Sequence, residues 1–138
     1  MNIAFLLTPK AELAFLYNDF SIRQALEKMN YHKYSAVPVI NRDGKYCGTI
    51  SEGDFLWFLV EGENGDIRKI DIKSVEHIAI SDIVKQDKNP AVRITATADE
   101  LLERATNQNF IPVTDDSGSF IGIVTRKKII DYLAKQVK

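Results

Sequence analysis

The sequence predicts an α+β fold built from two copies of one unit, in which a strand, a helix, two further strands and a second helix follow one another. Three features recur and predict this order. Each copy has an apolar strand that contains a proline, a glycine turn after it, and a returning strand that ends on Ser or Thr. Features that recur in the same order along a chain indicate an internal repeat.

The repeat has a constant offset of 74 residues over most of its length. The offset relates Pro38 to Pro112, Gly44 to Gly118, Gly48 to Gly122, Ser51 to Thr125 and Leu59 to Leu133. The two helix starts at Ser21 and Thr97 are 76 residues apart, so the first copy carries two extra residues before its proline strand. A unit of this size cannot bury both faces alone, and we expect the copies to pack as one pseudo-symmetric body.

The first copy is expected to contain a short helix over 2–7, a brief strand over 13–17, a helix over 21–31, strands over 34–40 and 46–50, and an apolar helix from 55. Pro9 ends the first helix, and Ser21 with Gln24 forms a capping box at the start of the second. Gly44 supplies the positive φ of the hairpin turn. Pro38 requires an edge position or a bulge, because proline donates no ladder hydrogen bond.

The second copy is expected to contain a mixed stretch over 67–76, a short helix over 80–84, a strand over 91–94, a helix over 97–105, strands over 110–113 and 120–124, and a helix over 129–135. Thr97 and Glu100 form its capping box, and Leu101, Leu102 and Ala105 carry the apolar face of that helix. Polar residues and glycines at 61–66 indicate a linker. The predicted organisation is one repeat over 1–62, a linker over 63–77 and a second repeat over 78–138.

Composition limits the possible functions. The chain has 138 residues, 45% of them hydrophobic and 27% charged, as in an ordinary globular protein. A net charge of −1 gives no general reason to expect nucleic acid as a partner. The single cysteine, Cys47, excludes an internal disulfide and fits the reducing cytoplasm. No apolar run indicates a membrane span or a signal peptide. The sequence also has no catalytic constellation and no metal-ligand spacing, so we expect neither an enzyme nor a metal site.

The strongest candidate site begins where the returning strand of the first copy ends, at Ser51-Glu52-Gly53-Asp54. A hydroxyl there lies beside the unpaired N–H groups of the next helix, where an anion is favoured. The carboxylate of Asp54 could accept hydrogen bonds from ribose hydroxyls. The alternative interpretation is structural, because Ser-x-x-Asp is nearly a capping box and a helix needs no ligand to have one.

Together these motifs resemble a pair of CBS domains, the Bateman module. The resemblance rests on the strands 36–39 and 110–113, the hairpin turns Asp43-Gly44 and Ser117-Gly118, and the segments 48–54 and 122–128. It implies two βαββα repeats that pack through their sheets with pseudo-twofold symmetry, and two clefts between them. It also implies a regulatory protein that forms homodimers.

The resemblance further implies site residues. If this chain resembles the CBS pairs that bind adenine nucleotides, Asp54 would contact the ribose, and Ser51 would contact the ribose or a phosphate. Main-chain groups of Ala36 and Val37, beside Pro38, would face the base, and the segment around Phe15 would form another wall. In the second copy the corresponding residues are Ile111 and Thr125, and Lys128 replaces the expected aspartate.

Three cations, Arg126, Lys127 and Lys128, stand at the start of the last helix. The helix dipole opposes each of them by roughly 0.3–1 kcal/mol at the surface. Bound phosphate would reverse the sign of this effect, because the cations and the helix N–H groups would then act together. The alternative is that the three side chains are simply solvated.

The sequence therefore predicts a cytoplasmic sensor that binds AMP, ADP or ATP between its repeats and signals to an unknown partner protein. We expect the sensor to need no obligatory cofactor. Cyclic di-AMP is the alternative ligand, because the basic turn suits two phosphates. A ligand-free dimerisation or interaction module is a further alternative, and contact with DNA through the basic turn is disfavoured by the acidic balance.

Overall fold

The computed structural model describes residues 2–62, 71–84 and 88–136 of the chain. The chain forms two compact units, and each consists of segments that are far apart in the sequence. The Asp54 unit consists of Ala14–Arg42 and Cys47–Lys88, and the Thr125 unit consists of Met1–Leu13, Asp43–Tyr46 and Asn89–Lys138. The units therefore divide the chain at other points than the repeats divide the sequence, and part of the expected linker lies outside the described residues.

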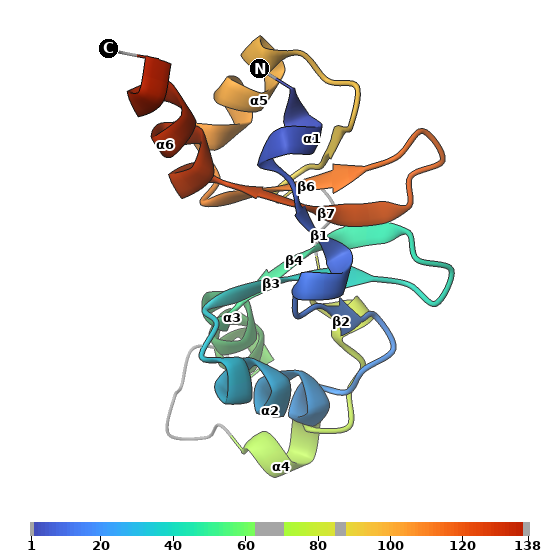
Figure 1. Cartoon of the computed structure of the whole chain (residues 1–138). Helices are drawn as coiled ribbons and strands as arrows, with labels where there is room; N and C mark the ends of the chain where they lie inside the picture. The colour runs from blue at the N-terminus through green and yellow to red at the C-terminus, as the bar shows by residue number, and fades with distance from the viewer. Residues whose placement is uncertain (1, 63–70, 85–87, 137–138) are drawn as a thin grey trace. The chain divides into compact units, whose positions relative to one another are not determined.

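The Asp54 unit contains a sheet in the order β2-β3-β4, with β2 parallel to β3. Helices α2 and α3 lie on the same side of β3 and β4 (Figure 1). Its elements are β2 (Leu16–Tyr17), α2 (Ile22–His32), β3 (Ala36–Ile40), β4 (Tyr46–Ser51), α3 (Glu52–Gly62), α4 (Ile72–Val75) and the 3₁₀ turn η3 (Ile80–Asp82). Its buried core is Leu16, Ile22, Ala25, Met29, Val37, Val39, Ile50, Phe55, Ile80 and Ile83.

The Thr125 unit contains a sheet in the order β1-β7-β6-β5. Helices α5 and α6 lie on one side of this sheet (Figure 1). Its elements are α1 (Ile3–Leu6), β1 (Thr8–Pro9), the 3₁₀ turn η1 (Lys10–Glu12), β5 (Val92–Arg93), α5 (Ala98–Ala105), β6 (Phe110–Thr114), β7 (Phe120–Thr125) and α6 (Arg126–Gln136). Its buried core is Ile3, Leu6, Val92, Leu101, Ala105, Ile111, Val113, Val124 and Ile129.

Local signals place most of these elements, and the α+β repeat order is confirmed. The capping box of α2 is complete, because Gln24 N–H donates to Ser21 Oγ at 3.1 Å and Ser21 N–H donates to Gln24 Oε1 at 2.9 Å. At the start of α5, Glu100 N–H donates to Thr97 Oγ1 at 3.2 Å. Gly44 has a positive φ of 83° in the first hairpin turn, as expected.

The proline strands lie at the centre of their sheets, although the sequence indicated an edge position or a bulge for Pro38. Pro38 is on β3, between β2 and β4. The pairing of β2 with β3 begins only at Val39, so Pro38 lies one residue outside it. Pro112 has the same relation to β5, whose pairing with β6 begins at Val113. A proline at such a position removes no hydrogen bond from the short partner strand.

Three local expectations differ from the structure. Strand β1 pairs Thr8 with Ile123 and Pro9 with Gly122, although the sequence indicated only a helix ended by Pro9. The stretch that the sequence left mixed contains helix α4, and the helix expected over 80–84 is the single turn η3.

Within the described ranges, no helix is long and apolar enough to cross a membrane.

Candidate functional site

The candidate site of the Asp54 unit lies where β4 ends and α3 begins. Ser51 N–H donates to Asp54 Oδ2 at 2.8 Å, and Asp54 N–H donates to Ser51 Oγ at 3.2 Å. This is the reciprocal geometry of a capping box, with aspartate in the place of the usual glutamate or glutamine. The structure therefore brings the two predicted residues together and uses both of them to start the helix.

A cation that the sequence did not predict completes this site. Lys88 Nζ contacts Asp54 Oδ1 at 2.5 Å, so each carboxylate oxygen of Asp54 has a partner. The Asp54 side chain is 18% exposed and the Lys88 side chain 47% exposed. Burial alone would raise the pKa of Asp54, but the hydrogen bonds from Lys88 and Ser51 outweigh it and hold the pKa below its usual value. Asp54 is thus a carboxylate at neutral pH.

The predicted base-contacting residues lie on β3, beside β4. Val37 and Pro38 are buried, and Ala36 is half-buried at the start of the strand. Glu52 N–H donates to the main-chain oxygen of Ser35 at 2.9 Å, which fixes the start of β3 against the start of α3. Any contact from the buried side chain of Val37 is made inside the core, so only main-chain groups of this segment suit a ligand.

Phe15 lies beside β2 and contacts other side chains of its own unit. Its ring packs edge-to-face on Tyr17 with a centroid distance of 5.6 Å, and Lys28 Nζ lies 5.3 Å from its centroid. Lys28 Nζ also donates to the Phe15 main-chain oxygen at 2.7 Å. Partial burial lowers the pKa of Lys28. Phe15 therefore has packing contacts within its own unit, and its role as a wall of a ligand site stays a prediction.

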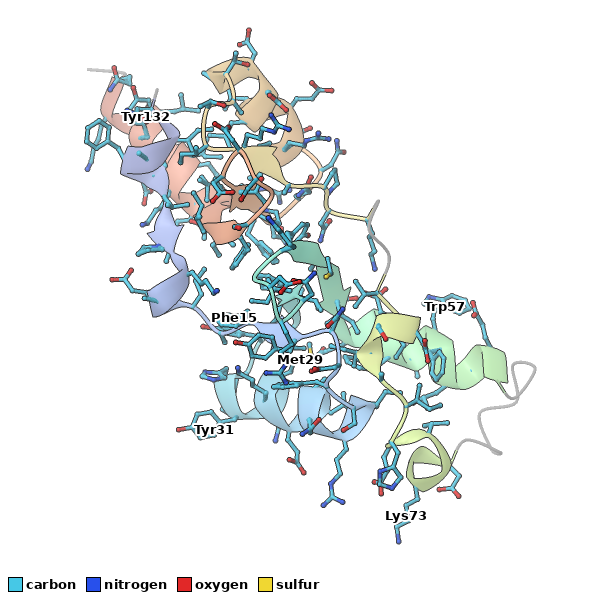
Figure 2. The ribbon with its side chains drawn as sticks, turned by 90° about the vertical axis from the view of Figure 1, so that its right-hand side faces the viewer. Phe15, Met29, Tyr31, Trp57, Lys73 and Tyr132 are labelled. Carbon is cyan, nitrogen blue, oxygen red and sulfur yellow. The ribbon has the colours of Figure 1, made fainter. Side chains whose placement is uncertain are left out.

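An open cavity of about 430 Å³ extends from Asp54 along α3. One face of α3 contributes residues at helical spacing, and the segment around η3 contributes the opposite side. The lining residues are Asp54, Trp57, Phe58, Glu61, Asp82, Ile83 and Lys88. Trp57 is 66% exposed and projects from α3 (Figure 2), so the cavity has an aromatic rim.

The Thr125 unit repeats the capping geometry without the carboxylate. Lys128 N–H donates to Thr125 Oγ1 at 3.2 Å, as Asp54 N–H does to Ser51 Oγ. Ile111 is fully buried in the core of this unit, so its side chain is not available to a ligand. This unit therefore has the hydroxyl of the motif, but the side chain at position 128 has no group that could accept hydrogen bonds from ribose hydroxyls.

Arg126 is engaged within its own unit. Its Nε donates to the Ala105 main-chain oxygen at 2.9 Å, and its Nη1 donates to Asn109 Oδ1 at 2.9 Å. Its N–H donates to the Asn109 main-chain oxygen at 3.0 Å, the counterpart of the bond between Glu52 and Ser35. The side chain therefore ties the end of α5 to the start of α6, whereas Lys127 and Lys128 are exposed.

Neither a metal-ligand cluster nor an activated thiol is found in the part of the chain that the structure describes. No cluster of three or more His, Cys, Asp or Glu side chains that could hold a metal ion lies in that part. Burial raises the pKa of the Cys47 thiol, which keeps it protonated and a poor nucleophile.

Sequence reasoning missed Lys88 and the cavity beside it. Lys88 lies 34 residues after Asp54, and no local pattern links the two. The spacing of Asp54, Trp57, Phe58 and Glu61 at i, i+3, i+4 and i+7 does place them on one helix face and could have indicated the α3 side of the cavity.

Comparison with known proteins agrees with the repeat and the fold. A family model described as the CBS domain matches residues 7–61 and 75–135. A CBS domain-containing protein of Dictyostelium discoideum is 30% identical over 123 residues, which cover 85% of this chain and 81% of the relative.

Solved structures resemble the whole chain. CbpB in complex with c-di-AMP is 24% identical with a TM-score of 0.86, over 98% of this chain and 85% of that one. CBSX2 in complex with AMP is 23% identical with a TM-score of 0.73, over 99% and 98%. At these identities the structures establish the fold alone. The doubled family match and the relative that is 30% identical show that the chain belongs to the CBS-domain family and consists of two tandem CBS domains.

Proposed function

We propose that this chain is a regulatory CBS module of the cytoplasm that binds an adenine nucleotide, AMP, ADP or ATP, at Asp54 and signals to a partner protein. The observation that carries the proposal is the Asp54 carboxylate, which Ser51 fixes at the start of α3 and Lys88 accompanies with a positive charge. Hydroxyls of a ribose are donors that suit a carboxylate, and a phosphate suits a lysine. The AMP bound to CBSX2 supports the same ligand class.

Regulation requires only that the ligand favours one arrangement of the module. A ligand that binds one state alone stabilises it by RT ln(1 + [L]/Kd), which is about 2.7 kcal/mol at a hundredfold excess over Kd. This is enough to shift a modest conformational equilibrium that an effector protein or the second subunit of a homodimer could read.

Two alternatives have observations in their favour. Cyclic di-AMP is favoured by the likeness to CbpB and by the exposed cations Lys127 and Lys128, which suit a second phosphate. A ligand-free interaction module is favoured by the reciprocal bonds of Ser51 and Asp54, which already satisfy both groups.

Thermal unfolding of the purified 138-residue chain with AMP, ADP, ATP, cyclic di-AMP and S-adenosylmethionine separates these functions. We expect a rise in Tm with an adenine nucleotide, and a smaller rise for Asp54→Asn, which preserves the shape of the side chain but not its charge. A rise with cyclic di-AMP alone would favour the first alternative. No rise with any compound at millimolar concentration would favour the ligand-free module.

A further inference from the structure

The ion pair between Lys88 and Asp54 occupies the group that the proposed ribose needs. Lys88 Nζ lies 2.5 Å from Asp54 Oδ1, and Ser51 N–H donates a hydrogen bond to Asp54 Oδ2 at 2.8 Å. The carboxylate is 18% exposed, so little of its surface remains for further donors. A ribose hydroxyl that approaches Asp54 must therefore compete with the ammonium group of Lys88.

The outcome of that competition depends on the charge of the ligand. A neutral nucleoside that displaces Lys88 leaves an ammonium group without its carboxylate, which costs the energy of the pair. A nucleotide brings a phosphate that can take the place of the carboxylate as the partner of Lys88. The exchange is then nearly balanced in charge, and the ribose gains Asp54.

Only one described side chain around the cavity can serve as the positively charged partner of a phosphate. Lys88 is the only cation among the described residues that line it, and Glu61 and Asp82 are carboxylates. Carboxylates repel phosphate, so they cannot assist an anionic ligand. A phosphate beside the ribose would find Lys88 as its partner in this cavity.

We infer that Lys88 is a specificity-determining residue of the Asp54 site. It favours the binding of adenosine ligands that carry a phosphate and disfavours the binding of the neutral nucleoside. The inference rests on the proposed function and adds to it the ligand property that the site selects. Lys88 acts as a competitor of the ribose in the free protein and as a phosphate partner in the complex.

Isothermal titration calorimetry of the 138-residue chain with AMP and with adenosine tests this role. The proteins compared are the wild type, Lys88→Met, Lys88→Arg and Lys73→Met. Lys73 is the matched control, because it is an exposed lysine of α4 that points away from the rest of the Asp54 unit and does not line the cavity (Figure 2). Arginine at position 88 retains the charge, whereas methionine retains much of the length without it.

We expect the wild type to prefer AMP strongly. In Lys88→Met the Kd for adenosine should fall and the Kd for AMP should rise, so that the preference for AMP drops by about tenfold or more, the factor that corresponds to 1.4 kcal/mol. Lys88→Arg and Lys73→Met should retain the preference of the wild type.

Two results would overturn the inference, and they differ in what they say of the proposed function. If the wild type binds AMP and Lys88→Met has an unchanged Kd for adenosine, Lys88 does not compete with the ribose, although nucleotide binding stands. If neither the wild type nor any variant binds AMP or adenosine, the proposed AMP site at Asp54 fails and the role of Lys88 fails with it.

Discussion

Ser51 and Asp54 hold each other at the start of α3, through Ser51 N–H to Asp54 Oδ2 at 2.8 Å and Asp54 N–H to Ser51 Oγ at 3.2 Å. The pair satisfies main-chain groups that a helix start would otherwise leave without a partner. It also fixes the carboxylate in one orientation, which is what a ligand site requires. Stability and binding therefore depend on the same two side chains, and their contributions need separate measurements.

Removal of the Ser51 hydroxyl should lower stability through the cap alone. Ser51→Ala leaves the N–H of Asp54 without its acceptor, and we expect the free energy of unfolding to fall by about 1 kcal/mol. Thr125→Ala should have a similar effect, because Thr125 Oγ1 accepts from Lys128 N–H at 3.2 Å. Urea denaturation followed by circular dichroism measures both changes.

Ser35→Ala is the control for this pair of variants. Ser35 is exposed, and Glu52 N–H donates to its main-chain oxygen, which the substitution retains. Its unfolding free energy should stay within about 0.5 kcal/mol of the wild type, as for most surface substitutions. Equal losses in all three variants would show that the caps do not account for the effect.

Acid should destabilise the protein partly through Asp54. The pKa of Asp54 is lower in the folded chain than its usual 3.8. A carboxyl of this kind adds stability above its unfolded pKa, and the contribution is lost as the pH falls from there through the folded pKa. Asp54→Asn should therefore show a smaller fall in unfolding free energy than the wild type between about pH 5 and pH 2.5.

Other acidic groups contribute to the same pH window but not to the difference between the two proteins. A hydrogen bond from Arg42 lowers the pKa of Asp19, and a hydrogen bond from Ser117 lowers that of Asp115. Both remain in Asp54→Asn. If the two proteins lose stability in parallel on acidification, the pKa of Asp54 does not change on folding.

Gly122 lies on β7 opposite Pro9 of β1, and any side chain there would collide with the main chain of the segment that contains β1. A Cβ at this position would lie 2.2 Å from the main-chain oxygen of Thr8 and 2.9 Å from Leu7 Cδ1. Gly122→Ala must separate β1 from β7, and we expect a loss of roughly 2–4 kcal/mol in unfolding free energy, in the range of large packing defects. Chemical denaturation measures it.

Gly44→Ala separates this collision from backbone strain. Gly44 has a φ of +83°, and a Cβ there would meet no atom within 4 Å. Its expected cost is only the penalty for a left-handed non-glycine residue, about 1–2 kcal/mol. A loss in Gly122→Ala no larger than in Gly44→Ala would contradict the close pairing of β1 with β7.

Features fixed by neighbouring residues could be predicted from the sequence. The capping box at Ser21, the hydroxyl cap at Thr97 and the turn at Gly44 depend on contacts within four residues, and the structure has them where the pattern indicated. The repeat strengthened each local prediction, because the same signal appeared 74 or 76 residues later. Ser51 and Asp54 belong to this class, since their mutual bonds span three residues.

Features fixed by distant residues could not be predicted in this way. The pairing of Thr8 with Ile123 joins opposite ends of the chain, and its two-residue strand has no alternating pattern. Lys88 meets Asp54 across a separation of 34 residues, and a single lysine carries no periodic signal. The charge that accompanies the proposed ribose site therefore required the structure.

The exposed cations of α6 offer a test in which stability and binding move in opposite directions. Lys128 lies in the first turn of α6, where the positive end of the helix dipole repels it. Lys128→Met should raise the unfolding free energy by about 0.3–1 kcal/mol. Lys135→Met, in the last turn of the same helix, should have the opposite or no effect, because a cation there is favoured.

A role in phosphate binding adds a second signature to Lys128→Met. If the basic turn binds phosphate, this stabilised variant should bind ATP and cyclic di-AMP more weakly than the wild type, while its Kd for adenosine stays the same. Isothermal titration with these ligands measures the difference. A gain in stability with unchanged Kd values would mean that Lys128 is a solvated surface residue with no part in phosphate binding.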